Sequence, residues 1–132
     1  MNSINVTRFI KLQKVILKTY EKAVETAARR SGISADEAEA LICLFERPNH
    51  KGTVENIKLP NAEETVKRLT ENSLTEKNAD EITLTGRGGI TAKSVTMTVE
   101  KFFSRMLEGI SPEEQFIIEA VLEKMYKNIE NN

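Results

Sequence analysis

Few side chains in this 132-residue sequence are of the types that enzymes use as nucleophiles, bases or metal ligands. There is one cysteine, Cys43, and one histidine, His50, which are too few for a zinc site with sulfur and nitrogen ligands. Two glutamate pairs, Glu63-Glu64 and Glu113-Glu114, stand at predicted helix starts, where the helix dipole explains them without acid–base chemistry. We therefore expect no catalytic residue, metal or cofactor, and predict that the chain is not an enzyme.

One glycine-rich segment, Gly86-Arg87-Gly88-Gly89, is followed by Lys93-Ser94 and superficially resembles a phosphate-binding loop. That loop requires a glycine immediately before the lysine, where this chain has Ala92, and a glycine where it has Arg87. We interpret the segment as a flexible break between a strand and a helix. By the same reasoning, Cys43 is interpreted as a buried, inert thiol and His50 as a solvated loop residue.

Length and composition limit the classes of protein to consider. With 39% hydrophobic and 30% charged residues, the chain has enough apolar side chains for one core and one domain. Its longest apolar runs are far shorter than a membrane span, and no secretory signal is visible at the N-terminus. The single cysteine excludes an internal disulfide, so we expect a reducing, cytoplasmic setting and no membrane contact.

Charge is balanced overall, at a net −1, but unevenly spread. Residues 1–32 have a net charge of +5, residues 33–76 a net −4, and residues 77–132 a net −2. Domains that bind nucleic acid strongly are often basic overall, so any DNA contact here must come from a local patch. The cations of the first helix could form one such patch, but a solvated helix face is the simpler explanation of them.

Apolar spacing and capping signals predict mostly helices. A helix over 4–30 has an apolar stripe and ends at Gly32. Ser34 and Glu37 form a capping box for a second helix, which Pro48 stops. A short turn is expected at 53–58, and Asn61 is expected to cap a further helix. The alternation in 81–85 predicts one half-buried strand, followed by a helix over 90–107 and a last helix that begins at Ser111-Pro112.

The order of these elements is typical of a winged helix-turn-helix protein. Three short helices followed by a small β element form such a lobe, and long amphipathic helices at both ends are often used to pair two copies. We therefore expect a mainly α fold with a small β-wing. A two-fold dimer would place two recognition helices one DNA turn apart, roughly 34 Å.

Four segments in this order carry a resemblance to a known family. Ile33 to Ile42 is similar to the second helix of the MarR family of bacterial transcription regulators, and Leu69 to Leu74 to the end of its recognition helix. Leu84-Thr85-Gly86 is similar to the family's sequence after the wing, and Gly109 to Glu114 to the start of its last helix. The resemblance covers most of the chain. It implies one MarR-like domain over 1–132, with a winged helix-turn-helix lobe at 33–89 and dimerisation helices at 1–32 and 90–132.

The implied function is a homodimeric regulator, most simply a repressor, that binds double-stranded DNA. Residues at the start of the short turn, in the recognition helix, in the wing and after it are expected to contact DNA: Thr53, Asn61, Glu63, Glu64, Thr65, Lys67, Arg68, Lys77, Asn78 and Arg87. Residues on the terminal helices are expected to form the dimer interface: Phe9, Leu12, Ile16, Ile118, Val121, Leu122, Met125 and Ile129. Soft and aromatic residues of the last two helices suit core and dimer packing, or a pocket for a small apolar or aromatic ligand.

Departures from the family pattern keep a second hypothesis open. The segment 52–69 is short, Ser73 replaces a usual glycine, and the wing 77–81 lacks the usual arginine tip. Glu63 and Glu64 repel phosphates unless they accept hydrogen bonds from cytosine amino groups. The alternative is a winged-helix dimer that has lost DNA reading and acts through protein contacts, as a modulator of another regulator.

Overall fold

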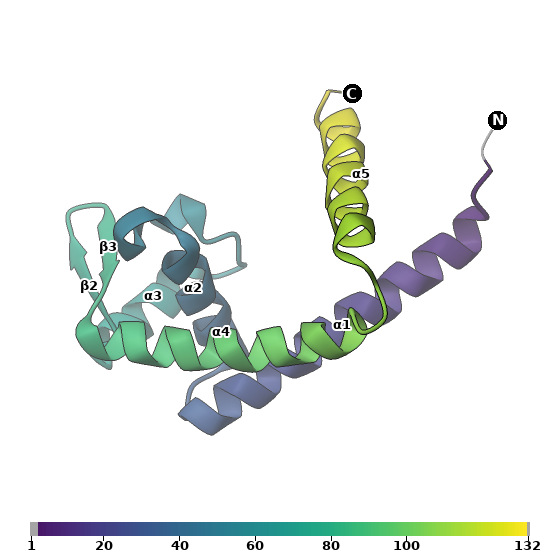
Figure 1. The fold of residues 1–132 in the computed structure, drawn as a ribbon. Coiled ribbons are helices and arrows are strands. Elements are labelled where there is room, and N and C mark those ends of the chain that lie inside the picture. The colour runs from purple at the N-terminus through teal and green to yellow at the C-terminus, as the bar shows by residue number, and fades with distance from the viewer. Residues whose placement is uncertain (1–2, 132) are drawn as a thin grey trace. The chain divides into compact units, whose positions relative to one another are not determined.

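The computed structural model describes residues 3–131 and is mainly helical, with a small three-stranded sheet (Figure 1). Its elements are, in chain order, α1 (Val6–Ser31), α2 (Ala35–Glu46), the 3-10 turn η1 (Pro48–His50), β1 (Lys51–Gly52), the 3-10 turn η2 (Val54–Asn56), α3 (Ala62–Glu71), β2 (Thr75–Asn78), β3 (Glu81–Leu84), α4 (Gly86–Met106) and α5 (Pro112–Glu130). The chain divides into two compact units, Met1–Phe102 and Phe103–Asn132. The mainly helical architecture with its small sheet confirms the predicted fold class.

Helix ends that depend on local signals lie where the sequence predicts them. Gly32 ends α1 with a left-handed backbone at φ 71°, a conformation that costs glycine no steric strain. The capping box of Ser34 and Glu37 is formed at the start of α2, with both hydrogen bonds 3.1 Å long. Ser111 and Glu114 form the second predicted box at the start of α5.

The core of the first unit lies where α2, α3 and the sheet meet. Its largest fully buried side chains include Leu41 and Leu44 of α2, Leu69 of α3 and Ile82 of β3. Full burial of each such side chain contributes about 1.5–3 kcal/mol. A helix of only ten residues would not be stable alone, so α3 depends on its packing against this core. The packing of its buried side also sets the orientation of α3.

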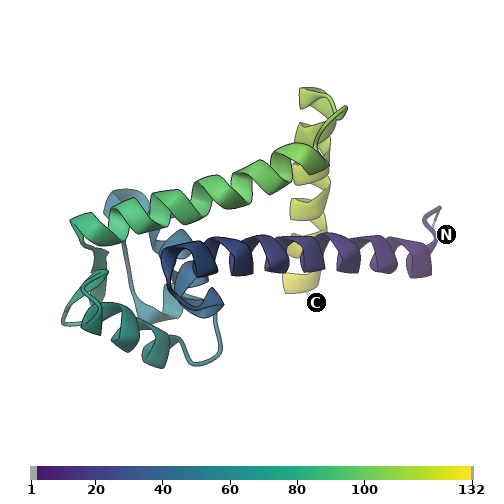
Figure 2. The ribbon, with the colours of Figure 1, turned by 90° about the horizontal axis from the view of Figure 1, so that it is seen from below.

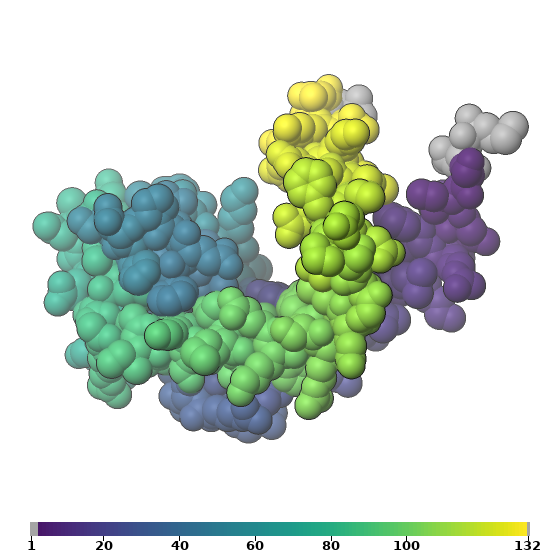
Figure 3. Space-filling view, viewed as in Figure 1, coloured from purple at the N-terminus to yellow at the C-terminus, as the bar shows by residue number. Residues whose placement is uncertain are grey.

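Helix α1 changes character along its length. Its C-terminal half buries four small residues, Ala23, Val24, Ala27 and Ala28. Its N-terminal half extends beyond the winged lobe (Figures 2 and 3) and exposes large apolar side chains, such as Leu12 at 51% and Leu17 at 55%. None of the described helices has the length and apolar composition that crossing a bilayer requires.

The wing has more strands than the one predicted from 81–85. β3 is central and pairs antiparallel with both β1 and β2, in the order β1-β3-β2. Thr75–Asn78, for which the sequence predicts no strand, pairs with β3 after the chain reverses at Ala79, where φ is 55°. Its side chains after Thr75 are all exposed, so no alternating pattern marks it. β1 has two residues and exists only through its pairing with β3.

The sequence predicts a flexible break at the glycine-rich segment, and this prediction is wrong. The segment forms the first turn of α4. Thr85 supplies the missing start signal. Its hydroxyl accepts a hydrogen bond from the Gly88 N–H at 2.9 Å, and its carbonyl accepts one from Gly89 at 2.8 Å. Capping by a threonine oxygen satisfies backbone donors that the first turn of a helix otherwise leaves unpaired.

The same first turn of α4 is bound to the end of α3 and the start of the wing. The Thr85 hydroxyl donates to the Ser73 carbonyl at 2.7 Å, and the Thr85 N–H donates to the Leu74 carbonyl at 3.2 Å. Gly88 is buried here, and a β-carbon on it would lie 1.8 Å from the Leu74 carbonyl oxygen. Position 88 therefore requires glycine for space.

We expect Gly88→Ala to lower the free energy of unfolding by about 1–3 kcal/mol, because the added methyl group forces α4 away from Leu74. Gly89→Ala is the matched control, since a β-carbon there meets no atom within 4 Å. It should be neutral or stabilising by up to about 1 kcal/mol. Urea denaturation followed by circular dichroism measures both, and equal stability of the two variants would contradict the packing described.

Candidate nucleic-acid interface

Helix α3 presents one buried and one exposed face. Ala62, Thr65, Val66 and Leu69 are buried against the core. The opposite side, here called the outer face of α3, consists of five polar residues: Glu63, Glu64, Lys67, Arg68 and Glu71. Four of them are exposed and Arg68 is half-buried, so these side chains are available to a partner.

Asn61 occupies the N-cap position of α3 as predicted, but its side chain makes no capping hydrogen bond. Its backbone is left-handed, with φ 60° and ψ 34°, whereas a side chain that caps normally extends from a β-region backbone. Asparagine tolerates this conformation better than most residues do. Its exposed amide group is therefore left to interact with a partner, and it is of the kind that pairs with adenine.

Thr65 does not belong to the exposed surface, contrary to its predicted contact with DNA. Its side chain is fully buried, and its hydroxyl lies 3.5 Å from a guanidinium nitrogen of Arg68. The period of the helix places Thr65 one turn before Leu69, on the core side. The residue supports the orientation of Arg68 and cannot itself reach a base.

Charges on the outer face of α3 partly neutralise one another. Arg68 forms an ion pair with Glu64 one turn earlier, at 3.8 Å. This pair is solvent-exposed and contributes at most a few tenths of a kcal/mol, so it leaves Arg68 free to exchange partners. Glu63 and Glu71 form no ion pair with any described residue.

A surface groove of about 440 Å³ runs between α3 and the wing. It is lined by Val54, Glu63, Val66, Lys67, Thr70, Glu71 and Lys77. The structure thus brings together Lys67 of α3 and Lys77 of β2, two residues that the sequence assigned to DNA contact separately. Asn78 follows Lys77 at the end of β2, where it pairs with Glu81 in the register of the sheet.

Two other predicted contacts, Arg87 and Thr53, do not line this groove. Arg87 lies on the first turn of α4 and lines a different, polar groove with Ser73 and Thr91. Thr53 precedes η2, where its hydroxyl donates to the Asn56 side chain at 3.1 Å. Hydrogen bonds from the Glu55 backbone and from Thr53 lower the pKa of the Glu55 carboxyl group, which favours its charged form.

Lys51, to which the sequence analysis assigned no role, is exposed on the edge strand β1. Its ammonium lies 3.6 Å from the carboxylate of Glu81 on β3. The signal that places it is the pairing of Lys51 with Thr83, which only the folded sheet provides.

The residues expected at the dimer interface lie uncovered on two helices. Exposed fractions range from 44% for Ile16, Val121 and Leu122 to 74% for Ile129. Phe9 and Met125 are half-buried. Apolar faces of this size are normally covered in a folded protein, and their exposure indicates that something packs on them.

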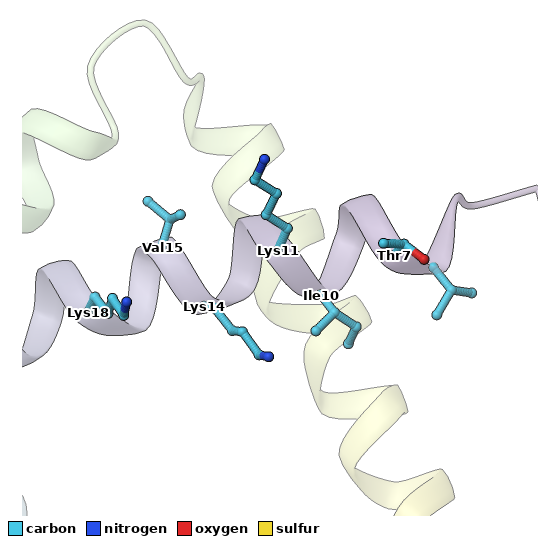
Figure 4. Close-up of a pocket in the computed structure, with 7 residues that line it drawn as sticks. Thr7, Ile10, Lys11, Lys14, Val15 and Lys18 are labelled. Atoms are coloured by element: carbon cyan, nitrogen blue, oxygen red, sulfur yellow. The ribbon is translucent and has the colours of Figure 1, made fainter.

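Three lysines of the N-terminal half of α1 line a surface groove of about 590 Å³ outside the winged lobe (Figure 4). Lys11, Lys14 and Lys18 project from it beside Ile10 and Val15. None of these lysines forms an ion pair within the part of the chain that the structure describes. This groove carries the positive charge that the outer face of α3 lacks.

A smaller cavity, of about 270 Å³, joins α1, α2 and the loop after η2. Burial and the neighbouring carboxylate of Glu39 raise the pKa of Tyr20 to about 12. Burial also raises the pKa of the Cys43 thiol, which donates a hydrogen bond to the Asn56 carbonyl at 3.1 Å. His50 is exposed as expected, and its ring stacks on Phe45 with centroids 4.8 Å apart.

We expect Cys43 to react with Ellman's reagent at pH 8 more slowly in the folded protein than in urea. Its raised pKa and half-buried position reduce both the thiolate fraction and access to it. The rate of thionitrobenzoate release measures this directly, and Cys43→Ser should release none. A folded protein that reacts as fast as the unfolded chain would contradict an inert thiol.

No family model matches the sequence, and no curated protein is similar to it in sequence. Among solved structures, a MarR family transcriptional regulator from Silicibacter pomeroyi is similar over 89% of this chain and 87% of its own, with TM-score 0.81 and 20% identity.

A MarR family protein from Bacillus stearothermophilus covers 98% of both chains, with TM-score 0.76 and 22% identity. An organohalide-sensing transcriptional regulator covers 96% of this chain and 82% of its own, with TM-score 0.68 and 15% identity. The chain therefore has the winged helix-turn-helix fold of MarR family transcriptional regulators.

Proposed function

We propose that this chain is a MarR-type transcriptional regulator that binds double-stranded DNA as a homodimer and acts as a repressor. The observation that carries the proposal is the outer face of α3. A winged helix-turn-helix lobe presents it beside Lys77 of the wing, in a fold similar over nearly its whole length to those of known regulators.

In this proposal α3 enters the major groove. An α-helix with its side chains is about 10–12 Å across and the major groove is about 12 Å wide, so α3 fits with its N-terminal residues toward the bases. Asn61 offers an amide to adenine, and Lys67 and Arg68 are donors for guanine or phosphate oxygens. Lys77, Asn78 and Arg87 approach the flanking backbone, where each cation releases counterions from the duplex.

The proposed dimer covers the apolar faces of α1 and α5. These faces remain open in the single chain, and their flanks differ in charge: residues 1–32 have net +5 and residues 77–132 net −2. Two copies that pair through these helices would hold their α3 helices about one DNA turn apart. A repressor of this kind binds a palindromic site and occupies it.

Ligand response belongs to the same proposal. One of the similar structures is an organohalide-sensing regulator. In this chain the cavity that Tyr20, Cys43 and Leu59 line joins α1 to the winged lobe, so a small apolar or aromatic molecule held there would act on both. Such a molecule shifts the dimer only to the extent that it binds one arrangement better than another.

A second candidate function rests on the charge of the lobe. The outer face of α3 has three glutamates against one lysine and one arginine, and residues 33–76 have net −4. An acidic surface repels DNA and fits a basic protein surface. The chain would then modulate another regulator by protein contact.

We expect the double substitution Lys67→Ala with Arg68→Ala to raise the Kd for operator DNA at least about tenfold. The slope of log K against log salt should become shallower by about 0.9 for each phosphate that the variant no longer neutralises. Fluorescence anisotropy with a duplex selected from a random library, at several salt concentrations, gives both quantities.

Lys14→Ala with Lys18→Ala is the matched control for charge, because both lysines are exposed on α1. It should leave operator affinity within about twofold of the unsubstituted protein. Wild-type protein that selects no duplex even at low salt would contradict the DNA-binding proposal and favour the protein-contact candidate.

We expect Leu122→Glu to convert the dimer into a monomer, because it introduces a charge on the apolar stripe of α5. Sedimentation equilibrium should give twice the 14.9 kDa chain mass for the wild type and the mass of one chain, 14.9 kDa, for the variant. Phe116→Glu is the control, since Phe116 is 74% exposed but faces away from the stripe by the helical period. A wild-type mass of 14.9 kDa would contradict the dimer.

A further inference from the structure

The two adjacent glutamates at the start of α3 are not equivalent in the structure. Glu64 lies 3.8 Å from Arg68, in a solvent-exposed ion pair within α3. Glu63 forms no ion pair with a described residue and lines the groove between α3 and the wing. An unneutralised carboxylate at this place is unfavourable beside a phosphate backbone unless a hydrogen-bond donor meets it.

Only some base edges supply such a donor. A carboxylate accepts hydrogen bonds and donates none. In the major groove, cytosine offers its N4 amino group, whereas guanine offers acceptors at O6 and N7 and thymine an acceptor at O4. Adenine has an N6 donor beside the N7 acceptor, which repels a carboxylate. Glu63 is therefore best matched to cytosine.

Lys67 completes the match from the same groove. It lies one helical turn after Glu63, a spacing that brings two side chains within about 5–6 Å on one face. Its ammonium has donors and no acceptor, which suits the O6 and N7 atoms of guanine. An acceptor and a donor one turn apart are complementary to the cytosine and guanine edges of one C·G pair or of two neighbouring pairs.

We propose that Glu63 determines specificity in each half-site by accepting a hydrogen bond from the N4 amino group of a cytosine, with Lys67 donating to guanine beside it. This inference rests on the proposed DNA-binding function and deepens it. The acidic residue that most disfavours DNA binding would then select among sequences, because guanine and thymine offer the carboxylate no donor and adenine places an acceptor beside its donor.

Glu63→Gln tests the proposal, since the amide keeps the size of the side chain and removes its charge. Glu63 is exposed, so the variant is expected to fold. Glu71→Gln is the matched control: it removes the same charge from the same groove, at the far end of α3 from the base-reading end. Each protein is used to select from a random duplex library at fixed salt, and the affinity for single-base variants of the enriched site is then measured.

Wild type and Glu71→Gln should both prefer cytosine over other bases at one half-site position, by roughly tenfold. In Glu63→Gln that preference should fall to about twofold or move to adenine, which pairs with glutamine through N6 and N7. Its affinity for unrelated duplex should rise, as it should in the control.

An unchanged cytosine preference in Glu63→Gln would overturn this inference and leave the DNA-binding function standing. Loss of the preference in Glu71→Gln as well would also overturn it, because charge alone would then explain the effect. Failure of the wild type to enrich any motif is a different result, and it would overturn the proposed function itself.

Discussion

The Leu74 carbonyl oxygen occupies the space in which residue 88 would carry a β-carbon, and this close approach determines how the winged lobe is assembled. Leu74 ends the connection from α3 and begins the wing, while Gly88 lies in the first turn of α4. Thr85 ties the same three elements by hydrogen bonds to Ser73 and Gly88. The first turn of α4 is thus bonded to the segment that directly follows α3, which joins the start of α4 to the end of the α3 connection.

Charge decides what that exposed face can do. The positive charge of the chain is concentrated on α1, and the winged lobe is acidic. Sequence-independent attraction to DNA through α3 is therefore weak, so the proposed binding there depends on matched contacts with particular bases. Under that proposal, an acidic α3 favours a selective regulator, whereas a basic helix would add affinity for every sequence. Because an acidic surface also fits a basic protein surface, contact with a protein partner is the main alternative to DNA binding.

Features that depend on neighbouring residues could be predicted from the sequence, and features that depend on distant ones could not. The capping boxes at Ser34 and Ser111 are local, and both are formed. The strand at 75–78 exists because β3 pairs with it, and its polar residues show no alternation. The predicted start of α4 was wrong because its glycines resemble a break until Thr85 and Leu74 are seen around them.

The candidate site shows the same division. The residue types of α3 were readable, and so was the acidity of its face. The spacing of Thr65 to Leu69 could have indicated its burial, although the sequence-based prediction placed it at the DNA. The uncapped amide of Asn61 could not be predicted, because it depends on a left-handed backbone at the start of the helix. The difference between Glu63 and Glu64 likewise emerges only when Arg68 is seen to pair with one of them.

The most direct test of the central claim, that the outer face of α3 and the wing contact a duplex, is chemical-shift mapping. Uniformly ¹⁵N-labelled protein would be titrated with a duplex that it selects, and amide shifts would be followed residue by residue. The account predicts that the largest changes fall at 61–68 and 77–78. Changes confined to the basic residues of α1, from Arg8 to Lys22, would contradict it and assign DNA contact to the first helix instead.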